Sequence, residues 1–420
     1  MKQPPLITPR EVDVPRAQRH TLPNGASLYA IPSDDFEVLR FTFVFRAGSS
    51  MQHAPFAASA TANMLSEGSR DMTARQIAEQ LDFYGSYFEV NVDRDYVYIS
   101  FSSLSKFFAP TLEVAEQILL QPLFPEDELR AYCEKRKQTL TIERRKVDTV
   151  VREIFAEALF GDKHPYGISY PEKDYDTLTR ADLESLYRRL YTAENCLVVC
   201  SGRIGEEELQ GIGALAEKLP RADRSATADF PAPRSEAYRF VERPDAVQSS
   251  LRVGRLLFTR THPDFVGMQV VATVLGGYFG SRLMQNLRGE HGYTYGVGAA
   301  MVNFEREGYL GIAAQVGAEV TAPALREIYN EIERLRREPM PFAGEEHHDG
   351  RGDAHPRRTV RHRRRDDRKP PLRHEQRCHR REHPPDTGNH PGRGTTAGRQ
   401  IPPPRRSYHG RRGSGRSIHK

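Results

Sequence analysis

The chain has 420 residues, of which 38% are hydrophobic and 28% charged, and this length allows two domains that each bury a core of their own. No stretch approaches the roughly 20 apolar residues of a membrane helix, and residues 1–20 lack the apolar centre of a signal peptide. These features argue against a membrane protein and predict a cytoplasmic one. The net charge of +5 is uneven, because residues 343–420 hold 21 Lys and Arg against 9 Asp and Glu, which leaves 40 against 47 for residues 1–342.

The four cysteines are expected to be free, structural thiols. Cys133 and Cys378 are isolated in the sequence. Cys196 and Cys200 lie on one predicted strand, about 13 Å apart, which is too far for a disulfide. A buried free cysteine behaves as a small hydrophobic residue.

The first half of the chain alternates strand and helix patterns. Residues 39–45 carry apolar side chains at every second position, as in a strand with one buried face, and an alanine-rich helix follows within residues 56–69. Alternating runs on both sides of the turn at residues 93–95 predict a hairpin. Further helices are predicted at 109–120, from 125 onward and at 182–190, and a buried strand at 196–200. This order indicates an α+β domain with a mostly antiparallel sheet and helices packed on one face.

The same order of elements returns after a linker. Residues 218–238 are rich in Pro, Ala and charge, which is typical of a linker. Beyond it the sequence predicts strands at 250–257, 295–302 and 309–316 and helices at 265–275 and from 322 onward. We therefore predict two related halves, residues 1–217 and 239–342.

The tail at residues 343–420 breaks this repeat. From residue 344 onward it has a single aromatic residue, Tyr408, and no apolar period, and it holds ten of the 15 histidines, so it is expected to be disordered. One interpretation is a basic arm that binds nucleic acid or acidic surfaces through phosphate contacts. The other is a frameshift product, which we favour because the tail replaces the elements that the second half still needs. Under this second interpretation the second domain lacks its C-terminal part, and nucleic-acid binding is not expected.

Several motifs occur in a characteristic order. They are LPNG at residues 22–25, the helix FAASATANMLSEGS at 56–69, HPYG at 164–167, LY at 190–191 followed by Asn195, and LRGEHGYTY at 287–295. Together they resemble the insulinase-like (pitrilysin and mitochondrial processing peptidase) family of zinc metallopeptidases. The resemblance extends from about residue 19 to residue 341.

The zinc motif is the conspicuous departure from that family. The family helix carries H-x-x-E-H, which places two imidazoles on one helix face within reach of a single zinc ion, with a glutamate as the base. This chain has Ser59, Ala62 and Asn63 at those three positions. A hydroxyl and an amide are poor zinc ligands, and alanine cannot accept a proton from water. We therefore expect no metal in this chain and no catalysis by this chain alone.

No other residues offer a replacement site. The family's third ligand would fall near Thr139, where Glu143 is the only nearby acid, and we interpret Glu143 as a solvated helix residue. His53 is interpreted as a loop residue, and His164 and His291 as single structural histidines. The glycines at 276–280 follow a helix and lack the order of a phosphate-binding loop, so we interpret them as a turn.

Two residues of the second half match substrate-contacting positions of the family. The resemblance implies that Arg288 and Tyr295, seven residues apart, reach a substrate bound at the zinc site. Guanidinium and phenol donors can bind a carbonyl and stabilise the oxyanion that forms on it. The structural alternative is that Arg288 pairs with Glu290 or another acid and that Tyr295 packs at a strand edge.

The sequence thus predicts a non-catalytic subunit. In heterodimeric members of the family, one chain carries the zinc and the other supplies the Arg/Tyr pair. The expected partners are a related subunit with an intact H-x-x-E-H, which would hold the zinc, and a peptide or unfolded polypeptide. The alternatives are a stand-alone metallopeptidase with unrecognised ligands and a peptide-binding or scaffold protein.

Overall fold

A computed structural model describes residues 14–221 and 230–338 of the chain. The predicted tail at 343–420, with Cys378, and part of the predicted linker lie outside the described residues. Cys133, Cys196 and Cys200 are free, as predicted, and burial raises the pKa of the Cys200 thiol to about 11. Within the described ranges, no helix is both long and apolar enough to cross a membrane.

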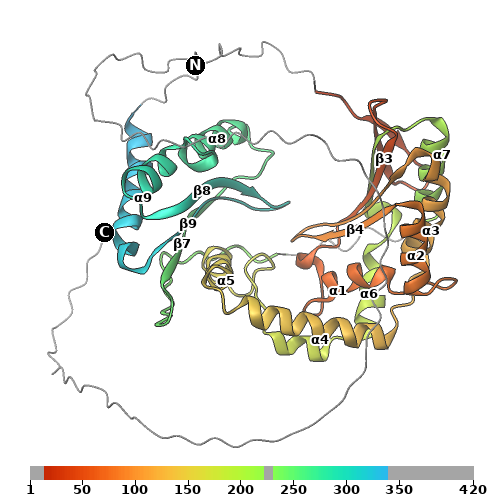
Figure 1. The fold of residues 1–420 in the computed structure, drawn as a ribbon, viewed down its shortest axis with the longest axis horizontal. Helices are drawn as coiled ribbons and strands as arrows, with labels where there is room; N and C mark the ends of the chain where they lie inside the picture. The colour runs from red at the N-terminus through yellow and green to blue at the C-terminus, as the bar shows by residue number, and fades with distance from the viewer. Residues whose placement is uncertain (1–13, 222–229, 339–420) are drawn as a thin grey trace, which may run out of the picture. The chain divides into compact units, whose positions relative to one another are not determined.

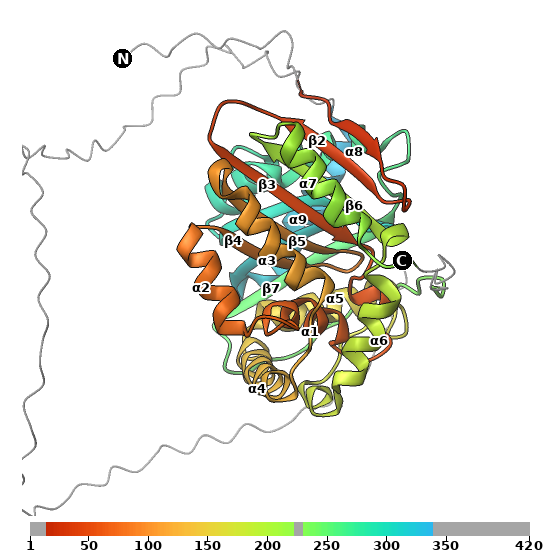
Figure 2. The same cartoon turned by 90° about the vertical axis from the view of Figure 1, so that its right-hand side faces the viewer.

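The first half is built on a six-stranded sheet with strand order β1-β2-β6-β3-β5-β4. All its strand pairs are antiparallel except β2 with β6. Figure 2 shows helices α2, α3 and α7 over one face of this sheet. The strands are β1 Gln18–Thr21, β2 Ser27–Pro32, β3 Val38–Phe45, β4 Tyr87–Val92, β5 Val97–Leu104 and β6 Cys196–Gly202. The helices are α1 Ala57–Asn63, α2 Ala74–Tyr84, α3 Phe108–Leu120, α4 Glu126–Glu143, α5 Val147–Phe160, α6 Arg180–Leu190 and α7 Glu206–Glu217.

Local sequence signals explain where these elements form. The apolar positions of β3 point into the core, where Phe41 stacks on Phe101 of β5 with ring centroids 5.2 Å apart. Thr179 begins α6 with a capping box, accepting a hydrogen bond from the backbone N–H of Asp182. The predicted α+β class with a mostly antiparallel sheet is therefore confirmed for this half.

The second half has a smaller sheet of three strands in the order β7-β9-β8. Figure 1 shows α8 and α9 on one face of it. Its elements are β7 Gln248–Leu257, α8 Phe265–Ala272, the π-helices η6 Thr273–Gly277 and η7 Met284–Glu290, β8 Thr294–Asn303, β9 Gly308–Gly317 and α9 Thr321–Arg337. The sequence predicts one α-helix over 265–275, but its last turns are π-helical. The backbone of Gly276 approaches β8 so closely that a Cβ would lie 2.5 Å from the nitrogen of Ala299.

The two sheets repeat the same arrangement, with one strand left unmatched. β3 pairs with β5 as β7 pairs with β9, and β4 pairs with β5 as β8 pairs with β9. However, β3 is also paired with β6 on its other edge, whereas β7 has no second partner strand in the described part of the chain. The apolar positions of β3 are buried, and none of the ten residues of β7 is. This arrangement fits the prediction that the second half lacks its last part, which stays a prediction.

A buried aspartate joins the two halves. Asp95, in the β4–β5 turn, accepts hydrogen bonds from the hydroxyl of Tyr166 at 2.5 Å and from the backbone N–H of Glu305 at 2.7 Å. Tyr166 also packs on Phe304, with ring centroids 4.4 Å apart. The turn that carries Asp95 is therefore fixed by contacts from both halves.

Candidate functional site

The helix α1 places the three positions of the lost zinc motif together but gives them other roles. The hydroxyl of Ser59 donates to the carbonyl of Phe56 at 3.0 Å, and the Nδ2 of Asn63 donates to the carbonyl of Ser59 at 2.7 Å. Ala62 is buried. Both polar side chains thus bond to their own helix, and the third position has no donor atom, so these residues do not fit a zinc ion.

The other candidate ligands are exposed or have partners of their own. Glu143 is exposed at the end of α4, and the hydroxyl of Thr139 donates to the carbonyl of Lys135 at 2.8 Å. The Nε2 of His53 lies 3.5 Å from a carboxylate oxygen of Asp182. Among the described residues, no three His, Cys, Asp or Glu side chains lie close enough together to hold one metal ion.

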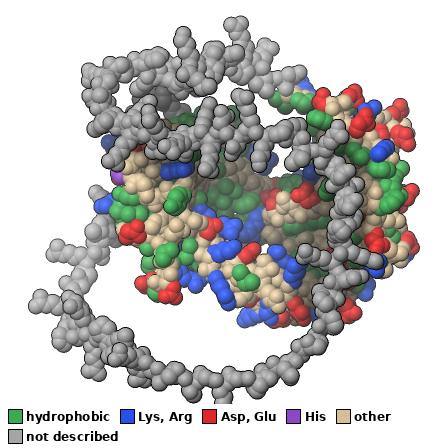
Figure 3. All heavy atoms as spheres, in the orientation of Figure 1, with side chains coloured by type: hydrophobic (Ala, Val, Ile, Leu, Met, Phe, Trp, Pro, Cys, Tyr) green, Lys and Arg blue, Asp and Glu red, His purple; other side chains and the backbone are tan. Residues whose placement is uncertain are grey.

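A cavity of about 200 Å³ opens beside α1, at the position of Ser59. Its polar and charged lining includes Gln52, Ser59, Arg94, Arg144 and Glu153. Figure 3 shows Lys and Arg side chains gathered over the α4–α5 region, where Arg144 and Glu153 lie. Of the three positions of the zinc motif only Ser59 lines this cavity, and the guanidinium groups of Arg94 and Arg144 line it as well.

The two guanidinium groups of this cavity differ in their partners. Arg144 donates to both carboxylate oxygens of Glu153 at 3.1 Å, to Glu172 at 2.6 Å and to the carbonyl of Tyr170 at 2.7 Å. Arg94 has neither an ion pair nor a side-chain hydrogen bond among the described residues. Burial lowers the pKa of Arg94, because water no longer fully stabilises its charge.

Arg288 lies exposed near the end of the π-helix η7. Its guanidinium stacks over the ring of Phe279, 4.7 Å from the ring centroid. It does not form the ion pair with Glu290 that the structural alternative requires, nor one with another acid in the described part of the chain. The helix itself is anchored by Asn286, whose Nδ2 donates to the buried carboxylate of Glu331 at 2.9 Å.

Tyr295 lies in a β-bulge of the edge strand β8. The register with β9 shifts between Thr294 and Val297, so that Tyr295 and Gly296 lie opposite the single residue Gln315. The hydroxyl of Thr294 holds the bulge by donating to the carbonyl of Gln315 at 2.5 Å and accepting from the N–H of Gly296 at 3.0 Å. The side chain of Tyr295 is 89% exposed, so it does not pack at the strand edge.

Contacts between η7 and β8 bring these two residues onto neighbouring elements. The N–H of Val297 donates to the sulfur of Met284 at 3.4 Å, and the N–H of Tyr293 donates to the carbonyl of Leu287 at 2.8 Å. Neither Arg288 nor Tyr295 is needed for these contacts. Both side chains are therefore available to a ligand.

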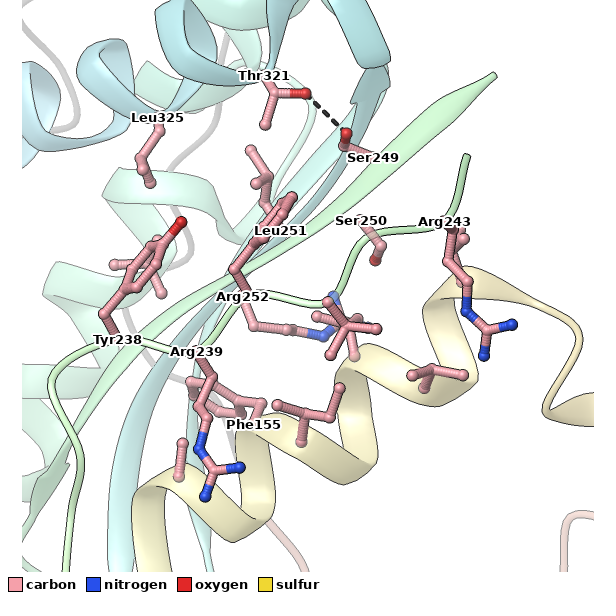
Figure 4. Close-up of a pocket in the computed structure, with 18 of the residues that line it drawn as sticks. Phe155, Tyr238, Arg239, Arg243, Ser249, Ser250, Leu251, Arg252, Thr321 and Leu325 are labelled. Atoms are coloured by element: carbon pink, nitrogen blue, oxygen red, sulfur yellow. Dashed lines mark hydrogen bonds between the residues drawn. The ribbon is translucent and has the colours of Figure 1, made fainter. Parts of the chain in front are cut away.

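A second, larger cavity of about 380 Å³ runs along the free edge of β7 (Figure 4). Residues 248–254 line it without interruption, so side chains of both faces of the strand border it. The other walls are α5, residues 236–243 and the start of α9, where the hydroxyl of Thr321 donates to Ser249 at 2.7 Å. We interpret this cavity as the space beside an unpaired strand, in the position that β6 occupies beside β3.

Sequence reasoning missed the cavity beside α1. Arg94 was interpreted only as part of a hairpin turn, and Arg144 and Glu153 gave no signal because neither belongs to a motif. Their convergence depends on contacts between segments that are far apart in the sequence. The one sequence signal for this cavity was Arg94, a cationic residue between two aspartates in a turn.

The fold and site define a class of protein with two related α+β halves, in which the helix α1 of the first half has Ser59, Ala62 and Asn63 in place of zinc ligands. Residues 177–343 match the family described as the peptidase M16 inactive domain. This match and the relatives described below make the chain similar to the insulinase-like peptidases, in agreement with the resemblance found in the sequence. In the solved structure of a peptidase M16 inactive domain from Pseudomonas fluorescens, 80% of the chain aligns with 77% of this one, with a TM-score of 0.72 and 25% identity.

Two curated relatives carry names of the same kind. An uncharacterized zinc protease of Rickettsia bellii is 25% identical over 282 residues, which cover 65% of this chain and 66% of that protein. An uncharacterized zinc protease of Mycobacterium tuberculosis is 28% identical over 205 residues, 47% of this chain and 46% of that protein. The chain thus matches about two thirds or less of the length of these relatives.

Proposed function

We propose that this chain is a non-catalytic subunit that completes the peptide-binding chamber of a related, zinc-bearing subunit. Arg288 and Tyr295 would contact the substrate near the scissile bond, and the zinc would belong to the partner. The proposal rests on the similarity to the insulinase-like family and on one contrast within this chain. At the positions of the zinc motif, the side chains of Ser59 and Asn63 bond to their own helix. In contrast, Arg288 and Tyr295 are exposed; Arg288 stacks on Phe279, and Tyr295 lies in a β-bulge.

The chemistry of the pair supports this role. A guanidinium and a phenol can donate hydrogen bonds to a substrate carbonyl and to the oxyanion that develops when water attacks it. Hydrogen bonds of Thr294 hold the backbone of the bulge that carries Tyr295, and the stacking on Phe279 restricts Arg288 without neutralising its charge. Donors that are positioned before the reaction stabilise the transition state without reorganisation.

The test combines this chain with the related subunit from the same genome that carries H-x-x-E-H. Alone, this chain is expected to contain no stoichiometric zinc by elemental analysis and to leave a fluorogenic unfolded peptide intact. The pair is expected to cleave it. Arg288→Gln or Tyr295→Phe in this chain should lower kcat/KM of the pair by about 10²–10³-fold, as for the loss of an oxyanion donor.

Matched controls are an exposed arginine and an exposed tyrosine elsewhere in the second half. Arg255→Gln in β7 and Tyr329→Phe in α9 should leave the rate unchanged. Zinc together with peptide cleavage in the isolated chain would establish a stand-alone metallopeptidase instead. Peptide binding with no effect of any zinc-bearing partner would establish a scaffold.

A further inference from the structure

The turn that carries Arg94 is fixed by backbone contacts. The N–H groups of Gly48, Ser49 and Ser50 donate to the three carbonyls of residues 93–95 at 2.7–3.0 Å. Gly48 is required for this approach, because a Cβ there would lie 2.5 Å from the carbonyl carbon of Asp95. The backbone position of Arg94 is therefore set before any ligand arrives.

Asp95, the acid that follows Arg94 in the sequence, forms its hydrogen bonds with other residues. Both carboxylate oxygens of Asp95 accept hydrogen bonds, one from Tyr166 and the other from the backbone N–H of Glu305. Glu153, the acid that lines the cavity, binds Arg144 through both of its oxygens. Asp95 and Glu153 attract the partly buried charge of Arg94, but neither forms an ion pair or a side-chain hydrogen bond with it.

The remaining lining of the cavity suits a small polar group. The amide oxygen of Gln52 accepts from the N–H of Ala58 at 3.1 Å, which leaves its Nε2 able to donate, and Phe56 contributes an apolar wall. At about 200 Å³ the cavity is smaller than the roughly 300–1,000 Å³ of pockets for drug-sized ligands. It has room for one end group of a chain rather than for a long segment.

We propose that this cavity binds a carboxylate, with Arg94 as the charge partner and the amide Nε2 of Gln52 as a second donor beside it. A guanidinium presents two parallel N–H donors to the two oxygens of a carboxylate, which a hydroxyl or an amide cannot do. Because it rests on the proposed function, the carboxylate is assigned to a peptide substrate, as its C-terminus or an acidic side chain. The first half would then bind a carboxylate of the substrate beside Ser59, the position of the zinc motif that lines this cavity.

The binding experiment uses the full chain and three labelled peptides of one unfolded sequence without acidic residues. One has a free C-terminus, one a C-terminal amide, and one an amide with an internal glutamate. Fluorescence anisotropy should show one of the carboxylate peptides binding about 10–100-fold more tightly than the neutral amide, as for hydrogen bonds to a charged group. The tighter one identifies the source of the carboxylate.

The variants test the assignment to Arg94. Arg94→Gln should abolish the preference for the carboxylate, whereas Arg94→Lys should retain part of it because the charge remains without the fork. Arg145→Gln, an exposed neighbour that does not line the cavity, should retain all of it. A preference that survives in Arg94→Gln, or equal binding of all three peptides by the unmodified chain, would overturn the proposal.

A second measurement separates this site from the proposed function. Acetate, titrated at constant ionic strength, should raise the melting temperature of the unmodified chain and of Arg145→Gln but not that of Arg94→Gln. This holds even if no peptide binds, in which case the peptide-binding function fails and the carboxylate site stands. Equal responses to acetate in the unmodified chain and Arg94→Gln would show that the carboxylate site is absent.

Discussion

Tyr166→Phe should destabilise the protein by about 2 kcal/mol, because it removes one hydrogen bond to a buried carboxylate. The tyrosine is 1% exposed and its hydroxyl donates to Asp95 at 2.5 Å. Burial and the neighbouring carboxylate raise the pKa of Tyr166, so the hydroxyl stays protonated and able to donate. A hydrogen bond to a charged group contributes about 1.5–3 kcal/mol. The carboxylate keeps the N–H of Glu305, which places the loss near the middle of that range.

The control is Tyr191→Phe, because Tyr191 is also 1% exposed but its hydroxyl has no partner among the described residues. Removing a buried, unpaired hydroxyl should leave the stability unchanged or raise it slightly. Urea unfolding followed by circular dichroism compares the two variants through the midpoint and the slope of the transition. A double-mutant cycle with Asp95→Asn should give a coupling of at least ~1 kcal/mol. Equal losses in Tyr166→Phe and Tyr191→Phe would refute the assigned role of the Asp95 bridge.

Three further predictions follow from the packing. Burial lowers the pKa of His164, so its unfolded form takes up a proton first as the pH falls, and stability should decline below about pH 6.5. His164→Asn should flatten that decline in urea midpoints, and His262→Asn, an exposed site with the same contact to a backbone N–H two residues on, should not. In hydrogen exchange, amides of β7 that face its open edge should exchange much faster than those paired with β9, and uniform protection along the strand would contradict an open edge. Gly276→Ala should cost about 1–3 kcal/mol in urea unfolding, because its Cβ would meet the backbone of β8, whereas Gly267→Ala in α8 meets nothing and should be neutral or stabilising.

The sequence predicted those strands and helices that carry a local signal, such as apolar side chains along one buried face or a capping residue. The alternation at residues 39–45 and the capping threonine at 179 each carry their own signal, and both elements form as expected. The parallel pairing of β2 with β6 could not be predicted, because it joins residues about 170 positions apart. The π-helical turn at η6 depends on the contact of Gly276 with β8, which no local propensity encodes.

The residues of the candidate site could be predicted from the sequence, but their environment could not. Ser59, Ala62 and Asn63 were found because a motif fixes their spacing, and Arg288 and Tyr295 because the resemblance assigns them a position. Their exposure, the bulge and the stacking on Phe279 became visible only in the structure. The role of the pair in substrate contact stays a prediction.

Ser59, Ala62 and Asn63 in α1 leave two views of the first half: either its metal site has simply decayed, or the half is specialised to bind another ligand. If the metal site had merely decayed, the lining around it would be free to lose its charge, since a partly buried arginine without a partner is unfavourable. Instead the turn that carries Arg94 is braced by three backbone hydrogen bonds, and Arg144 is bound by two carboxylates. A partly buried cation on a braced turn, without an ion pair of its own, is more readily explained by a ligand that pairs with it. Arg94→Gln distinguishes the two views through stability alone: under decay it should stabilise the protein in the absence of any ligand and nothing should reverse the gain, whereas under specialisation a carboxylate should restore the advantage of the arginine.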